Sequence, residues 1–186
     1  MANQWGTIGI PSESRFVKLY FEPASEQFLA HFYKGLGEGY GVKSIYARHF
    51  SDETYRKITP EDESLTYEDV VLCRDLSRVF VNVFKVRMRS NNFVGYEWHS
   101  VQAIDTDTGE VCVLLSARDL AVEPPYVKAW ISRLRKVKES GNAIICTIAF
   151  KRMREGHGTA IENYICKINS RTGQYKRVTR LGNEQP

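Results

Sequence analysis

The chain has 186 residues, of which 42% are hydrophobic and 12% aromatic, so it can bury a sizeable core. It contains no apolar run of about 18 residues, and its start (MANQWGTIGIPSES) lacks a basic segment followed by an apolar one, which excludes a spanning helix and a signal peptide. The four cysteines are scattered without a CxxC pair, which favours a reducing cytoplasm and predicts no metal site and no cofactor.

The net charge of +4 is unevenly distributed along the chain. Residues 1–76 carry 8 basic and 12 acidic side chains, whereas residues 77–186 carry 18 and 10. Such a split suggests that the basic half binds nucleic acid or another anionic surface. We therefore predict an acidic N-terminal portion, residues 1–76, and a basic nucleic-acid-binding domain, residues 77–186. The polar run Ser51–Asp69, which contains a proline, is the predicted connection.

The N-terminal portion is predicted to form a β-α-β unit. Arg15–Phe21 and Val42–Phe50 are rich in aromatic and β-branched residues and are predicted strands. Between them, Ser25 can cap a helix over SEQFLAHFYKG (Ser25–Gly35), whose large apolar residues fall on one helical face. The following GLGEGYG is interpreted as a turn, because a phosphate-binding glycine loop needs a strand before it and a helix after it.

The second half is predicted to be mainly antiparallel sheet with one helix. Predicted strands cover Arg78–Met88, Phe93–Asp105, Glu110–Leu115, Ala143–Phe150, Ala160–Ile168 and Gly173–Leu181. Tyr126–Ser140 is a predicted helix after Pro124-Pro125, with an apolar stripe at helical spacing and a basic face that includes Lys128 and Arg133. The basic face is either solvated or a secondary contact with nucleic-acid backbone. The predicted fold class is therefore α+β, mainly antiparallel sheet.

The order strand, strand, strand, helix, strand, strand in residues 78–168 resembles the OB-fold in topology, over about half of the chain. The resemblance implies a ligand across the second and third strands, held by two loops. On this sequence the loops are Ser90–Asn92 and Lys151–Gly158, the second of which reads KRMREGHG. An open four-stranded sheet of the Whirly type is an alternative with the same meander.

Cations and aromatic residues alternate along these strands. Single-stranded nucleic acid needs cations to follow its phosphates and flat rings on which its bases stack. The candidate binding residues are Lys85, Arg87, Arg89, Tyr96, Trp98, Lys151, Arg152, Arg154, Tyr164, Lys176 and Arg177. The competing interpretation is that the rings belong to the core and the cations are solvated strand ends that discourage aggregation.

We therefore expect a non-catalytic protein that binds single-stranded DNA or RNA with low sequence specificity. Its N-terminal portion is expected either to pack on the basic domain or to mediate self-association into a homo-oligomer. The chain ends TRLGNEQP, without the acidic tail of bacterial single-strand binding proteins. A small binder without that tail fits a phage or a mobile element.

Two alternatives are open. His49-Phe50-Ser51 and His157-Gly158-Thr159 both fit H-x-[ST], which is similar to the paired motif of 2H phosphoesterases. That resemblance implies that His49 and His157 act as general acid and base on cyclic nucleotides or RNA ends, with Ser51 and Thr159 holding the phosphate. The other alternative is a structural or anti-defence protein whose basic face binds another protein.

Overall fold

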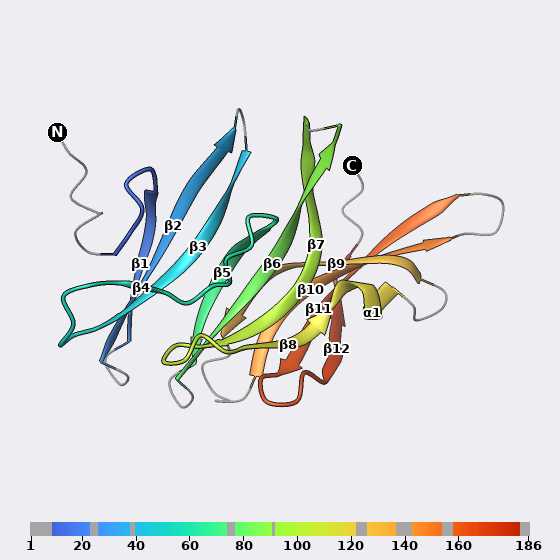
Figure 1. Ribbon diagram of the computed structural model, residues 1–186. Helices are drawn as coiled ribbons and strands as arrows, with labels where there is room; N and C mark the ends of the chain where they lie inside the picture. Colours follow the sequence, from blue (N-terminus) through green and yellow to red (C-terminus); the bar gives the residue numbers. More distant parts are fainter. Residues whose placement is uncertain are drawn as a thin grey trace.

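The structure, a computed structural model, describes residues 9–22, 26–37, 40–73, 77–90, 92–121, 126–136, 143–153 and 158–182. These residues form three antiparallel four-stranded sheets (Figure 1). The N-terminal sheet contains β1 (Arg15–Glu22), β2 (Gln27–Gly37), β3 (Tyr40–His49) and β4 (Arg56–Lys57). The central sheet contains β5 (Leu65–Cys73), β6 (Arg78–Arg89), β7 (Asn92–Asp105) and β8 (Val111–Ser116). The C-terminal sheet contains β9 (Tyr126–Lys136), β10 (Ala143–Met153), β11 (Thr159–Asn169) and β12 (Tyr175–Arg180), and a short helix, α1 (Ala117–Ala121), precedes it.

The central sheet is covered on both faces. Val79, Val81 and Val83 of β6 are fully buried against the N-terminal sheet, in a cluster with Leu29 and Ile45. Phe80 points to the other face and packs in a second cluster with residues of β9, β10 and β11. A strand buried on both faces is expected to be apolar at nearly every position. This explains why Val79–Phe84 of β6 is apolar at every position except Asn82.

The outer face of the N-terminal sheet is partly covered by the segment that precedes β1. Ile10 is buried there against Ala30, Phe32 and Tyr46. The other face of β2 carries Leu29, which belongs to the cluster with the central sheet. Consecutive positions of β2 are therefore buried on opposite sides.

The predicted α+β class is wrong, because the described chain is almost entirely β. The predicted helix Ser25–Gly35 coincides with β2, whose burial on both faces places apolar residues at neighbouring positions and imitates a helical stripe. The N-terminal β-α-β unit is therefore absent from the described residues.

The predicted helix Tyr126–Ser140 coincides with β9. A β-bulge explains this error: the pairing with β10 shifts near Arg133, which has a positive φ of 53°. Buried residues consequently fall at Ala129, Ile131 and Leu134. The last interval is three residues instead of two, which resembles helical spacing.

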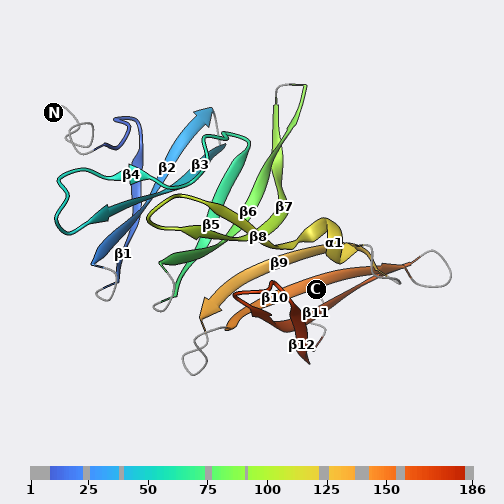
Figure 2. The same ribbon diagram turned by 60° about the horizontal axis from the view of Figure 1, so that its bottom comes forward.

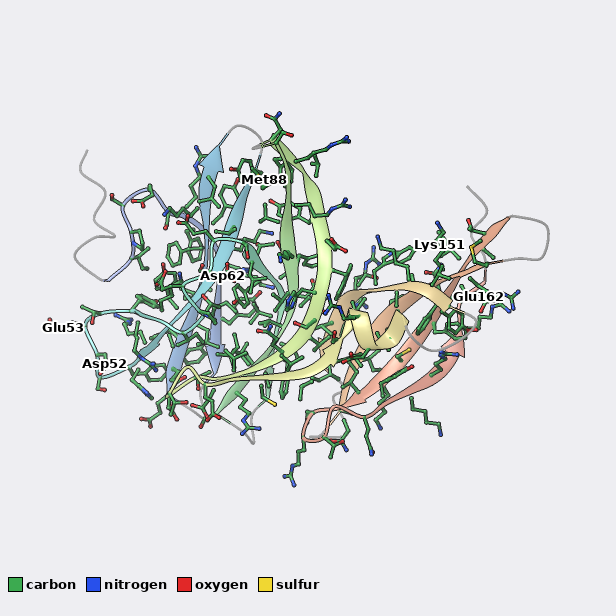
Figure 3. The ribbon with its side chains drawn as sticks, turned by 45° about the vertical axis from the view of Figure 1, so that its right-hand side comes forward. Asp52, Glu53, Asp62, Met88, Lys151 and Glu162 are labelled. Atoms are coloured by element: carbon green, nitrogen blue, oxygen red, sulfur yellow. The ribbon has the colours of Figure 1, made fainter. Side chains whose placement is uncertain are left out.

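Two hairpins extend beyond the layered core as arms (Figure 1). β8 pairs with β7 only at Ser100–Ile104, and β5 pairs with β6 only as far as Lys85, so the remainder of β6 and β7 forms a two-stranded ribbon. The second arm is formed by the ends of β10 and β11 that meet at Met153 and Thr159. Met88 marks the first arm and Lys151 the second in Figure 3.

The predicted division after residue 76 falls between β5 and β6, which are paired neighbours in the central sheet. The division into two domains stays a prediction.

Candidate nucleic-acid interface

A surface groove lies where the β6–β7 arm leaves the central sheet and passes β9. β9 runs beside α1 in both ribbon views (Figure 2). The groove has three hollows of about 500, 190 and 320 Å3. Glu97, Trp98 and Lys128 line both the first and the second hollow, and Tyr96 lines both the second and the third. The shared residues show that the hollows adjoin one another.

Aromatic side chains from two sheets line the middle of the groove. Tyr96 and Trp98 come from β7, and Trp130 comes from β9. Trp98 is partly buried, with its ring centroid 4.7 Å from that of Phe84. Tyr96 is 45% exposed, and its hydroxyl donates to the carbonyl oxygen of Gly41 at 2.7 Å, which fixes the ring to the N-terminal sheet. The rings are therefore held in place but accessible at the surface.

The largest hollow and the middle hollow carry four cations and one carboxylate. Lys85, Arg87, Arg118 and Lys128 contribute the positive charges, and Glu97 contributes the negative one. Glu97 lies 3.7 Å from Arg87, and both are about half exposed, so this ion pair is weak. These two hollows therefore have a net positive charge.

Lys151 adds a further cation next to the groove. It stands directly opposite Lys128 in the β9–β10 ladder. Like charges at directly opposed positions destabilise a sheet. An anion bound between the two lysines would offset that repulsion.

The third hollow lies between two β-bulges. Asp69 in β5 and Arg133 in β9 both have positive φ values, 46° and 53°, and both line this hollow. The Asp69 carboxylate accepts a hydrogen bond from Asn82 Nδ2 at 2.8 Å and one from the Leu134 amide at 3.4 Å. Asp69 therefore joins the central sheet to the bulge of β9.

A different arrangement holds Arg152, Tyr164 and Arg177, which lie on β10, β11 and β12 of the C-terminal sheet. The Arg177 guanidinium lies 4.5 Å from the centroid of Phe150 and 5.1 Å from that of Tyr164. The Tyr164 hydroxyl donates to Glu162 at 2.9 Å, and Arg152 lies 3.7 Å from the same carboxyl group. These predicted binding residues are thus engaged with one another.

Glu162 is the centre of this second cluster and is almost completely buried. It also accepts hydrogen bonds from Tyr126 and Arg180. Burial alone would raise the pKa of Glu162, but the hydrogen bond from Tyr164 and the charges of Arg180 and Arg152 outweigh it and lower the pKa. Burial, together with hydrogen bonds to Tyr126 and Glu162, raises the pKa of Tyr164 to about 12. We refer to Glu162 and these partners as the Glu162 cluster.

The predicted binding residues thus separate into groups. Lys85, Arg87, Tyr96 and Trp98 meet in the groove, and Lys151 adjoins it. Arg152, Tyr164 and Arg177 belong to the Glu162 cluster. Arg89 is exposed at the tip of the first arm, and Lys176 is exposed on β12. Arg154 lies outside the described residues.

His49 of the first H-x-[ST] motif and Thr159 of the second lie in different sheets. His49 ends β3, and its Nε2 lies 3.0 Å from Gln27 Nε2 and 3.4 Å from a carboxylate oxygen of Asp107. Ser51 is exposed and donates to Asp52, while Thr159 begins β11 in the C-terminal sheet. His157 lies outside the described residues, and the phosphoesterase mechanism stays a prediction.

Sequence reasoning placed Trp130 and Lys128 on a helix and did not include Arg118 among the binding residues. The sequence does carry a signal for Lys128 and Trp130. They are separated by one residue, as Tyr96 and Trp98 are. In a strand this spacing places both side chains on one face. Arg118 lies in α1, which no sequence pattern predicted.

Within the described residues, no helix approaches the length and apolar character needed to cross a bilayer. No group of three or more acidic, histidine or cysteine side chains in this part of the chain could hold a metal ion. A comparison with models of known protein families finds no match, and a comparison with curated protein sequences finds none either.

Proposed function

We propose that this protein binds single-stranded DNA or RNA without catalysis, with low sequence specificity, in the groove between β7 and β9. The observation that carries the proposal is the pair Trp98 and Trp130, contributed by two sheets to one hollow that Arg87 and Lys128 also line. Single-strand binding requires this combination, because bases stack on aromatic faces while cations follow the phosphates.

The groove supports binding of an unpaired strand in particular. Its rings lie side by side along β7 and on the facing β9, where unstacked bases can reach them. A duplex keeps its bases stacked and presents mainly phosphates and groove edges. Base–aromatic stacking tolerates any base, because every base has a π-face. Low sequence specificity follows from recognition of this kind.

The charges of the groove predict a measurable dependence on salt. If Lys85, Arg118, Lys128 and Lys151 each neutralise one phosphate, the logarithm of the binding constant should fall by roughly 3 per tenfold increase in salt, since each contact with a single strand contributes about 0.7. Lys128→Gln should reduce this slope by about 0.7 and weaken binding to all sequences similarly.

Fluorescence anisotropy with labelled single-stranded homopolymers, titrated over a range of salt concentrations, tests the proposal. Arg118→Gln in the groove has a matched control in Arg171→Gln, since Arg171 is exposed in the β11–β12 turn. We expect weaker binding from the first variant and unchanged binding from the second. Absence of binding to DNA and RNA at low salt would refute the proposal, and so would equal binding by both variants.

A second readout reports the aromatic residues. Bound bases should quench tryptophan fluorescence, and Trp98→Phe with Trp130→Phe should remove most of the quenching while preserving the apolar packing. Quenching that persists unchanged in the double variant would place the bound strand elsewhere on the protein.

A further inference from the structure

β1 is an edge strand with exposed apolar side chains. Among the described residues it pairs only with β2, and it lies at the outer margin of the N-terminal sheet (Figure 1). Phe16, Leu19 and Phe21 are 49%, 46% and 53% exposed. Proteins usually protect sheet edges with charges or covering segments, because an open apolar edge is a template for pairing with another strand.

A β-bulge places the two phenylalanines on the same face. The β1–β2 register shifts between Phe16 and Lys18, which makes Val17 an extra residue. Phe16 stands opposite Phe32 and Phe21 opposite Phe28, both on the outer face. In a regular strand, residues five positions apart point to opposite faces. The bulge therefore aligns one apolar row along the edge.

When the bulge residue Val17 is left out, the order of side chains along β1 is complementary to the same order in a second, antiparallel copy of β1. Its ladder positions are Arg15, Phe16, Lys18, Leu19, Tyr20, Phe21 and Glu22. In an antiparallel pair of two such strands centred on Leu19, position 15 faces position 22, 16 faces 21, 18 faces 20, and 19 faces its own equivalent. The opposed residues are then arginine with glutamate, phenylalanine with phenylalanine, lysine with tyrosine, and leucine with leucine. Each of these combinations is favourable across strands.

We propose that two copies of this chain associate through antiparallel pairing of their β1 strands about a twofold axis at Leu19. The two N-terminal sheets become one continuous sheet, and the outer-face residues of both copies form a single apolar cluster. Phe50, which is 43% exposed and stacked on Phe21 at 5.3 Å, extends this cluster away from the axis. The charge order of β1 selects a second copy, since an unrelated strand would not supply charges in the reverse order.

Charge reversal tests the pairing by sedimentation equilibrium. The wild-type protein should show twice the chain mass with a concentration-dependent monomer fraction. Arg15→Glu or Glu22→Arg alone creates two like-charge pairs across the axis and should raise the dissociation constant about tenfold or more. The double variant R15E/E22R should restore the dimer, and a mixture of the two single variants should form a heterodimer.

Disulfide trapping is a second test that does not depend on charge. The two Leu19 side chains face each other at the axis, so Leu19→Cys in a Cys112→Ser background should cross-link under mild oxidation. Ile161→Cys in the same background is the control, because Ile161 is equally exposed but lies on β11 of the C-terminal sheet, outside the proposed β1–β1 interface. A monomeric wild-type protein, single charge variants that dimerise like the wild type, or cross-linking no faster than in the control would each overturn the proposal.

Discussion

The carboxylate of Glu162 should contribute strongly to stability, and Glu162→Gln removes its charge without changing its shape. Hydrogen bonds to a charged acceptor contribute about 1.5–3 kcal/mol each and neutral ones about 0.5–1.5, so the bonds from Tyr164 and Tyr126 should each lose about 1 kcal/mol. Arg152 and Arg180 are about half exposed, so their ion pairs add about 0.5 kcal/mol at most. The expected loss is about 2–3 kcal/mol, or roughly 5–10 °C in Tm for a chain of this size.

The effect should also depend on pH, because the folded state lowers the pKa of Glu162 below its ordinary value of 4.5. A depressed carboxyl pKa stabilises the folded state above the ordinary value, and this stabilisation is lost as the pH falls through the lowered one. Urea unfolding at neutral and acidic pH should therefore show a difference between wild type and Glu162→Gln that disappears in acid.

The control is Glu110→Gln, the same chemical change at an exposed position. A loss below about 0.5 kcal/mol for Glu162→Gln would refute this account of the cluster, because surface substitutions have effects of that size. So would a difference that persists unchanged at low pH.

Two further predictions concern backbone geometry and a buried histidine. Gly173 has a φ of 73°, and a Cβ there would lie 2.2 Å from the carbonyl oxygen of Leu114. Gly173→Ala should therefore lower the free energy of unfolding by about 2 kcal/mol or more, measured by thermal unfolding. The control Gly182→Ala, which has open space around it, should change this free energy by less than about 0.5 kcal/mol. Burial lowers the pKa of His31 to about 4, and its Nε2 donates to the Tyr67 carbonyl at 2.7 Å. Since the unfolded imidazole takes up a proton near its ordinary value of 6.5, stability should fall by up to about 3 kcal/mol between there and pH 4, and His31→Gln should lose this dependence in pH-resolved denaturation.

Most strands could be predicted because their residues alternate or are continuously apolar between turn signals. Arg78–Met88 and Phe93–Asp105 match β6 and β7 closely, and the turn that contains Gly173 lies where the sequence places it. The errors fall where a second layer or a bulge alters the pattern. The start of β5 falls within the polar run Ser51–Asp69, a predicted loop. This part of β5 contains the acidic residues Glu68 and Asp69, which lie at a β-bulge.

The candidate site could be predicted only in part from the sequence. The alternation of Lys85, Arg87, Tyr96 and Trp98 indicates exposed polar and aromatic side chains on paired strands, and these residues meet in the groove. The spacing of Lys128 and Trp130 indicates that they share a strand face, but their place in the groove could not be predicted, because the facing residues of β7 lie about 30 positions earlier in the chain. Tyr164 and Arg177 are residue types typical of a binding surface, but Tyr164 donates to the buried Glu162 on its own strand and Arg177 lies over the Tyr164 ring, so both belong to an internal network.

The position of the central sheet has a consequence for synthesis of the chain. β1–β4 leave the ribosome before β5, β6 and β7, which supply most of the residues that pack with Leu29 and Ile45. At about 5–20 residues per second, the interval from residue 57 to residue 105 lasts on the order of 2–10 s. During that time the nascent N-terminal sheet exposes an apolar face, so chaperone occupancy should be highest before residue 105 has emerged.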